Sequence, residues 1–403
     1  MPIRMALNLS TALAMNRSLV ELTMTVDSTT VLCLQGLRQN TALRHLSLNA
    51  VDWGSAGELG VALATVLSQN ASLESLCLKT DGTNFSDKTG TVLAQALTQN
   101  TSLASLHIST EDTSVGDETG IALAEALWLN DVLRHFLWAA GRTRLTDLTG
   151  RTLAQAAQQN CNLQSFQFSA VGTELSDETG MAMAAVLENF ALHSFSFEAS
   201  ETQVGDISGI AFAKSLHSSA SLRRFSFVGN FCNVSEETCR AMGEAVGSTC
   251  LTAFEFSALH LFVSERTSIC LRNALQRNNS LESIKFQTCQ LDGDRAYTAV
   301  QEAVGKAIFK RGQRRCEHQP GCPCFQLSSD MPSKDLETSC LSCSDWGSAI
   351  VIEKESGEDA AFRSGKLSYA DSLSETDIGD GEAEAITTVS STDTPIWESM
   401  QGV

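Results

Sequence analysis

The sequence repeats itself at intervals of about thirty residues, and this period limits most strongly what the chain can fold into. Leucines mark the repeat at Leu43, Leu73, Leu103, Leu133, Leu163, Leu192, Leu222, Leu251 and Leu281. An Asn lies three residues before most of them, at Asn40, Asn70, Asn100, Asn130, Asn160, Asn189 and Asn278. A unit this short cannot bury its apolar side alone and must stack on its neighbours. The repeat therefore predicts a solenoid whose functional surface extends over several units.

Each unit contains a strand pattern. Leu43-Arg-His-Leu46-Ser-Leu48 reads LxxLxL, and its last three positions alternate apolar and polar, which predicts a strand with one buried face. Later units carry aromatic residues at the two buried positions: Phe166 and Phe168, Phe195 and Phe197, Phe225 and Phe227, and Phe254 and Phe256. We expect these rings to stack as a spine in the core and do not interpret them as a cofactor-binding box.

A helix pattern follows each strand. The segment from Asp87 to Leu97 recurs from Asp117, Asp147, Asp177 and Asp206, with apolar residues at helical spacing. A hydroxyl residue precedes Asp87, Asp147 and Asp177, so we expect a capping hydroxyl and a carboxylate in the first helical turn. Strand, loop, helix and turn make the complete unit, and about ten parallel strands are expected at spacings of about 4.8 Å.

The full motif, D-x-T-G-x-x-L-A-x-A-L-x-x-N-x-S-L-x-x-L-x-L, resembles the ribonuclease-inhibitor-like class of leucine-rich repeat, as in the repeat arrays of NOD-like receptors. The resemblance covers roughly residues 9 to 300. It implies an α/β horseshoe with a parallel sheet on the concave face, helices on the convex face, and protein recognition as its role.

One part of the family pattern is missing. The buried Asn that follows the strand in the family appears only as Asn230, with Cys289 as a substitute. Other units place Asp81, Glu111, Gly141, Val171 and Ser200 there. The backbone of these turns must therefore find other hydrogen-bond partners, and we expect the longer loops of the middle units to accommodate the change.

The sequence predicts three regions: a repeat array of about ten units over residues 1–305, a basic, Cys-containing junction over 306–324, and an acidic tail over 325–403. The tail has sixteen Asp and Glu against four Lys and Arg, and is predicted to be disordered. Within it, only residues 346–352 (WGSAIVI) are apolar enough to be a docking motif. Since the first residues match the middle of a repeat, it stays open whether an upstream domain precedes them.

Metal binding is considered at one place. Cys322, Cys324, Cys340 and Cys343 have a spacing at which thiolates can close a zinc site. Because CxC is a rarer ligand pair than CxxC and the stretch between the two pairs lacks the pattern of a zinc ribbon, free or redox-labile thiols are favoured, and no metal and no cofactor is assigned.

Charge and cysteine content limit the partners. A net charge of -19 argues against nucleic acid and anionic membranes, which are bound by an excess of Lys and Arg. No apolar run is long enough for a membrane span. Thirteen cysteines scattered through the chain fit reduced thiols better than a disulfide framework, which predicts a cytoplasmic protein.

The residues between the buried strand positions are expected to face a partner protein. The candidates are Arg44, His45, His107, Arg134, His135, Leu137, Gln167, His193, Arg223 and Arg224, together with Trp128 from a helix. The unit that holds Trp128, Arg134 and Leu137 differs most from its siblings. Because exposed Trp and Arg are typical interface anchors, we expect it to centre a binding patch, the alternative being repeat drift.

These residues share no catalytic geometry, so the sequence favours a non-enzymatic scaffold or ligand-sensing module that binds a protein on its concave face. The partner and the oligomeric state are not indicated. A second hypothesis is a GTPase-activating regulator of a Ran-type small GTPase, because such regulators resemble this chain in joining leucine-rich repeats to an acidic tail.

Overall fold

The computed structural model describes residues 3–27, 31–50, 55–291 and 350–351, in which strands and helices alternate. The strands are β1 Glu21–Val26, β2 His45–Ala50, β3 Ser75–Lys79, β4 Ser105–Ser109, β5 His135–Ala139, β6 Ser165–Ser169, β7 Ser194–Glu198, β8 Arg224–Val228, β9 Ala253–Val263, β10 Ser283–Leu291 and β11 Ile350–Val351. The helices are α1 Ile3–Met15, α2 Ser55–Leu67, α3 Asp87–Gln99, α4 Asp117–Leu129, α5 Asp147–Gln159, α6 Asp177–Val186, α7 Asp206–Ser218, α8 Glu236–Val246 and α9 Glu265–Arg277. Between β1 and β2 the helix is replaced by a 3₁₀ segment, η1 Val31–Arg38.

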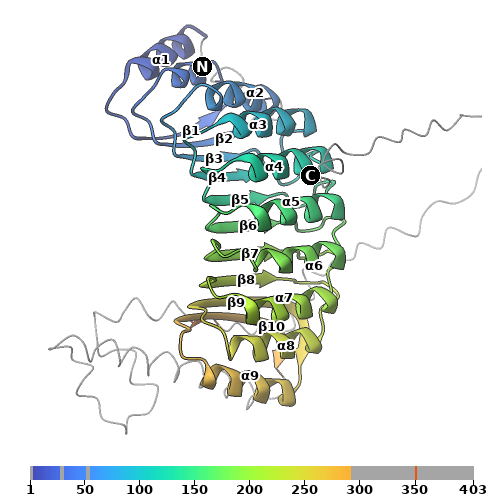
Figure 1. The fold of residues 1–403 in the computed structure, drawn as a ribbon. Helices are drawn as coiled ribbons and strands as arrows, with labels where there is room; N and C mark the ends of the chain where they lie inside the picture. The colour runs from blue at the N-terminus through green and yellow to red at the C-terminus, as the bar shows by residue number, and fades with distance from the viewer. Residues whose placement is uncertain (1–2, 28–30, 51–54, 292–349, 352–403) are drawn as a thin grey trace, which may run out of the picture. The chain divides into compact units, whose positions relative to one another are not determined.

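All described strands form one open parallel sheet in chain order, from β1 to β11. Equivalent positions of successive units pair directly, as Leu76 with Leu106 and Leu106 with Phe136. Figure 1 shows the strands stacked as rungs, with the helices stacked alongside them. The expected fold class is confirmed: the chain forms an α/β repeat solenoid of leucine-rich-repeat type.

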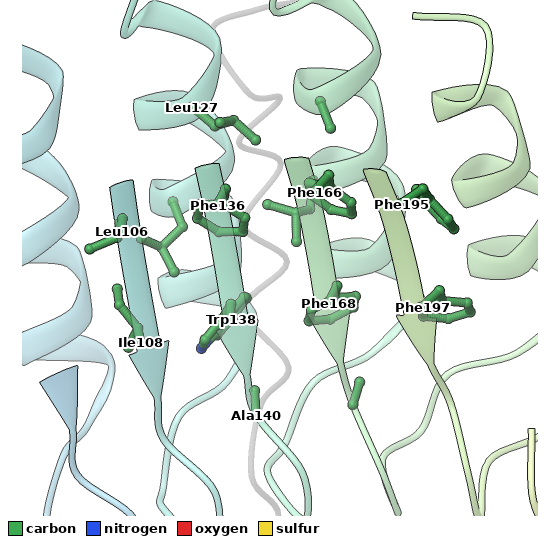
Figure 2. Close-up of a cluster of buried hydrophobic side chains, with 14 of the residues drawn as sticks. Leu106, Ile108, Leu127, Phe136, Trp138, Ala140, Phe166, Phe168, Phe195 and Phe197 are labelled. Carbon is green, nitrogen blue, oxygen red and sulfur yellow. The ribbon is translucent and has the colours of Figure 1, made fainter. Parts of the chain in front are cut away.

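The core lies between the sheet and the helices. Figure 2 shows two rows of buried side chains on neighbouring strands, one through Phe136, Phe166 and Phe195 and one through Trp138, Phe168 and Phe197. The Phe136 and Phe166 ring centroids lie 5.8 Å apart with nearly parallel planes, and those of Phe168 and Phe197 lie 6.1 Å apart. Stacking at these distances adds about 0.5–1.5 kcal/mol per pair beyond area burial. The predicted aromatic spine is confirmed.

The first-turn Asp of helices α3 to α7 bonds to the next unit. Asp147 accepts hydrogen bonds from the backbone N–H of Ser176 at 2.9 Å and from the hydroxyls of Ser176 and Thr179, both at 2.6 Å. Partial burial raises the pKa of Asp147, but these hydrogen bonds outweigh it and hold the pKa below its ordinary value. Asp87, Asp117, Asp177 and Asp206 accept equivalent bonds. The carboxylate therefore joins neighbouring units as well as lying in the first turn of its own helix.

The Gly of the same motif makes room for this contact. A methyl group added at Gly150 would overlap the side chain of Thr179, and one added at Gly120 would overlap Thr149. Each helix thus presents a gap that the hydroxyl residue of the next helix fills. The D-x-T-G motif supplies both sides of the contact between units. Its Asp and Gly contact the Thr of the following unit, and its own Thr packs against the Gly of the preceding unit.

The repeated Asn forms a second ladder, where each helix ends. The amide nitrogen of Asn130 donates to the carbonyls of Leu97 and Asn100 in the preceding unit, at 2.8 and 3.0 Å. Its amide oxygen accepts from the N–H groups of Val132 and Leu133. Asn40, Asn70, Asn100, Asn160, Asn189 and Asn278 make the same pattern in their units. Ser219 stands where α7 needs such an Asn, and its buried hydroxyl has no hydrogen-bond partner among the described residues.

The turns that lack the family's buried Asn bond to one another. The N–H of Asp112 donates to the carbonyl of Gly141 at 3.0 Å, and the N–H of Arg142 donates to Val171 at 2.6 Å. Within each loop a Thr hydroxyl closes the turn, as Thr113 does by donating to a carbonyl three residues earlier at 2.7 Å. Loop-to-loop main-chain bonds thus supply the partners that the sequence left unassigned.

Candidate functional site

The repeat exposes three surfaces that carry the predicted binding residues. The strand-entry edge is where a helix ends and the next strand begins; the strand-exit edge is where a strand ends and the next helix begins. The sheet face lies between them, on the side of the sheet away from the core. Along each strand, exposed or half-buried sheet-face residues alternate with buried ones, as in His135 to Ala139. The positions expected to face outward therefore do so.

The sheet face holds six of the predicted residues: His45, His107, His135, Leu137, Gln167 and Arg224. Most of their neighbours are short, including Ser47, Ser75, Ser105, Ser165, Ser194, Ser196 and Ser226. These hydroxyl groups make the sheet face polar.

Among the described residues, one thiol–imidazole contact lies on this face. It joins His107 Nδ1 and Cys77 Sγ, which are 3.5 Å apart. Burial lowers the pKa of His107, and the charge of Lys79 lowers it further. The imidazole is therefore neutral at neutral pH and cannot stabilise a thiolate as an imidazolium would. The described residues contain no group of three His, Cys, Asp or Glu side chains placed to hold a metal ion.

The strand-exit edge is acidic, and its charges are used within the protein. Arg142 donates to both carboxylate oxygens of Asp112, at 2.6 and 2.7 Å, and lies 3.6 Å from Glu111. The Arg142 hydrogen bonds hold the pKa of Asp112 below its ordinary value. Asp81 accepts a hydrogen bond from Ser109 at 2.6 Å. Asp112 and Asp81 are therefore bound to other groups of the protein.

The strand-entry edge brings together large apolar and basic side chains. Trp128 and Leu129, in the last turn of α4, are 51% and 52% exposed, and Phe190, between α6 and β7, is 87% exposed. We call the following residues the entry patch: Trp128, Leu129, Arg134, His135, Phe190, His193, Arg223 and Arg224. They lie around the starts of β5 to β8, and these four neighbouring strands span about 15 Å.

Within the described ranges, the arginines of the entry patch have no carboxylate partners. Arg44, further along the same edge, lies 3.3 Å from Glu74. Arg134, Arg223 and Arg224 make no ion pair with any described residue, and Arg223 donates to two backbone carbonyls instead. The exposed acids on this edge of the four units are Asp131 and Glu188. The entry patch is therefore a basic and aromatic area on a protein with a net charge of -19.

The structure regroups the residues of the most divergent unit. Trp128 and Arg134 lie at the strand-entry edge, whereas Leu137 lies on the sheet face. Two patch residues were missed in the sequence, Leu129 and Phe190. Phe190 follows a ladder Asn, at a position where other units have Ala71, Thr101, Asp131 and Cys161. An aromatic residue at this small or polar position was the available signal.

Comparisons with known proteins add little to this geometry. No protein-family model matches the sequence. No curated protein sequence matches it either. Among solved structures, actin-binding site 2 of leiomodin-1 aligns with a TM-score of 0.34 and 14% identity over 41% of this chain and 93% of that chain. The tropomodulin C-terminal domain of Caenorhabditis elegans aligns with a TM-score of 0.34 and 16% identity over 41% of this chain and 98% of that chain. Likenesses of this size carry no conclusion about a partner.

Proposed function

We propose that the chain is a non-enzymatic protein-binding repeat module, and that its entry patch binds an acidic partner segment that also carries apolar side chains. The observation that supports this proposal is that Arg134, Arg223 and Arg224, which form no ion pair with a described residue, lie beside exposed Trp128 and Phe190 on an otherwise acidic protein. Buried Trp and Arg residues supply much of the binding energy in protein interfaces.

The chemistry of each group indicates the partner. A guanidinium forms two parallel hydrogen bonds with a carboxylate, so three unpaired arginines favour Asp and Glu. Phe190 and Trp128 each offer a large aromatic surface whose burial favours association. The sheet-face candidates His45, His107, Leu137 and Gln167 would extend the contact for a partner that crosses from the edge onto the sheet.

The finer assignments belong to the same proposal. The thirty-residue motif supports the ribonuclease-inhibitor-like class of leucine-rich repeat. The seven cysteines from Cys33 to Cys270 are free thiols, which supports a reducing, cytoplasmic compartment. Among the described helices, none is long and apolar enough to cross a membrane.

Site-specific photocrosslinking tests the location of the site. A benzophenone amino acid placed at Phe190 is expected to capture partner peptides rich in Asp and Glu. The matched control is the same probe at Phe262, which is 65% exposed and lies in β9. Capture at position 190 should disappear when Arg223→Glu and Arg224→Glu are added. Equal capture of the same peptides at both positions would contradict the entry patch as the site.

A direct binding measurement tests the partner chemistry. The probe is a fluorescent peptide that alternates Glu and Leu, compared by anisotropy with a twin that has Lys in place of Glu. We expect the acidic peptide alone to bind, and the Arg223→Glu, Arg224→Glu variant to bind at least about tenfold more weakly, because like charges replace attraction. Binding of the Lys peptide, or a preference for single-stranded DNA over the acidic peptide, would refute the proposed partner class.

The alternative function, activation of a Ran-type GTPase, has no supporting observation among the described residues or in the comparisons. A GTP-hydrolysis assay with Ran-type GTPases tests it, and acceleration by the full chain would restore it.

A further inference from the structure

The last strand of the array has a neighbour from far along the chain. On one side β10 pairs with β9, and on the other it pairs in parallel with β11, with Ile284 opposite Ile350 and Lys285 opposite Val351. These pairs extend the sheet by one more strand, β11. Residues 292 to 349 separate the two strands, so β11 is supplied by the region that the sequence assigns to the acidic tail.

The geometry of β10 explains why its outer edge takes a strand. An edge strand presents a row of backbone N–H and C=O groups that pair with any extended chain that fits. β10 runs over nine residues, from Ser283 to Leu291, and β11 pairs with two of them. Ile284 and Phe286 are buried in the core, so the backbone that carries the edge is held in place.

The sequence around β11 fits this edge better than the rest of the tail does. Residues 346–352 read WGSAIVI and include three consecutive β-branched residues, which favour strands. The surrounding tail is dominated by acidic and small polar residues, which do not. The long connection is a small obstacle, because the entropic cost of closing a loop grows only with the logarithm of its length.

We propose that the outer edge of β10 is a strand-accepting site, and that residues 346–352 of the same chain are its occupant. Main-chain hydrogen bonds supply the affinity, and the alternating side chains of the occupant supply the selectivity, as in other cases of strand addition. The occupant covers the edge of the array and tethers the acidic tail to it. This inference is independent of the entry patch, which lies at α4 to β8.

Hydrogen–deuterium exchange on the full chain tests the pairing. The variant Ile350→Pro, Val351→Pro removes two N–H donors and disfavours the strand. We expect amides within Ser283–Leu291 to exchange at least about tenfold faster, while those of β3 are unchanged. The matched control is Ile386→Pro, Val389→Pro, which makes the same two changes elsewhere in the tail. Unchanged exchange of β10 in the first variant, or equal acceleration by the control, would refute the pairing.

Addition of the segment as a separate peptide tests the site itself. A fluorescent peptide of residues 344–354 should bind the Ile350→Pro, Val351→Pro chain more tightly than the wild-type chain, in which the site is occupied. A scrambled peptide of the same composition should bind neither. Equal binding of the scrambled peptide would refute a register-specific site.

Crosslinking distinguishes an occupant from the same chain from one supplied by a second copy. Lys285 lies opposite Val351, and Lys354 follows three residues later, so a lysine-specific reagent should join these two lysines. In a mixture of unlabelled and ¹⁵N-labelled chains, the linked peptides should carry one label only. Mixed-label pairs in the statistical proportion at every dilution would show that a second copy supplies the strand, and would overturn the assignment to the same chain.

Discussion

The two edges of the array are made from the same repeat, yet they treat their polar groups differently. At the strand-exit edge, Asp147 and its equivalents bond to the next unit, and Arg142 is bound to Asp112 on the outside. At the strand-entry edge the interior is bonded by the Asn ladder, while Arg134 and Arg223 on the outside have no ion pair among the described residues. The charges at the strand-exit edge thus contribute to stability, whereas some charges at the strand-entry edge remain available to a partner.

This difference shows where a substitution should affect folding and where it should affect binding. A charge that bonds to the next unit contributes to stability in proportion to its hydrogen bonds. An exposed charge without a carboxylate partner, such as Arg223 with its bonds to nearby backbone carbonyls, contributes little to stability and remains available for recognition. The predictions below test this separation, from the largest expected effect to the smallest.

The largest effect is expected from Asp147→Ala at the strand-exit edge. The change leaves the hydroxyls and N–H groups of Ser176 and Thr179 without their acceptor, so the free energy of unfolding should fall by about 2–3 kcal/mol. Asp131→Ala, at the strand-entry edge, is the matched control and should change it by less than about 0.5 kcal/mol. Urea denaturation measures both, and equal losses would remove the distinction between the edges.

Ser219→Asn should stabilise the strand-entry edge. The Asn would restore the missing rung of the ladder and replace a hydroxyl that has no partner, which should raise the free energy of unfolding by about 1 kcal/mol. Ser219→Ala should be nearly neutral, because it removes the unsatisfied hydroxyl without adding a rung. Thermal unfolding of the two variants distinguishes them, and a destabilised Asn variant would show that this position is not part of the ladder.

A smaller contrast is expected between two exposed arginines. Arg142→Ala should lower the free energy of unfolding by about 0.5–1 kcal/mol, because it breaks a two-point hydrogen-bonded pair with Asp112. Arg223→Ala should leave the free energy of unfolding unchanged within error but weaken binding of the acidic peptide. If Arg223→Ala lost stability and kept binding, the assignment of roles to the two edges would be reversed.

The smallest effect concerns pH. The pKa of His107 is lowered in the folded protein, chiefly by burial, so below its ordinary value of 6.5 the unfolded chain binds more protons than the folded one. Stability should therefore decrease as pH falls through about 6.5, and the decrease should be smaller in His107→Gln. His45→Gln is the control on the same face. Melting temperatures between about pH 7.5 and pH 5.5 measure the difference, and identical pH dependence of wild type and His107→Gln would contradict it.

Most of the fold could be predicted from the sequence because each unit carries separate patterns for its strand and for its helix. Alternation of Leu and Phe at the strand positions defined the buried face, and the spacing of the helix residues defined the other layer. The Asn that precedes each leucine was visible, but its donation to the preceding unit was not, because a contact between units is absent from the pattern of one unit. The role of the Asp in joining neighbouring helices was hidden for the same reason.

The candidate site was predicted less completely. Trp128 and Arg134 were identified because their unit differs most from the others, and His193 and Arg223 because they lie between the buried strand positions. Phe190 was missed because it lies outside the strand pattern that predicted most of the candidates. The residues exposed at this edge include those of the turn after the helix. The pairing of Ile350 with Ile284 could not be read from spacing, since residues of a nonrepeating segment have no register until they are paired.

The Thr and Gly of the D-x-T-G motif have a consequence for how such an array changes in length. A copied block of thirty residues would carry its own inserting hydroxyl at one side and its own receiving gap at the other. It would therefore fit between any two of the middle units without altering either junction. Duplication could add whole units at no cost to the contacts already present, so the number of units is governed by whatever terminates the sheet at its two ends.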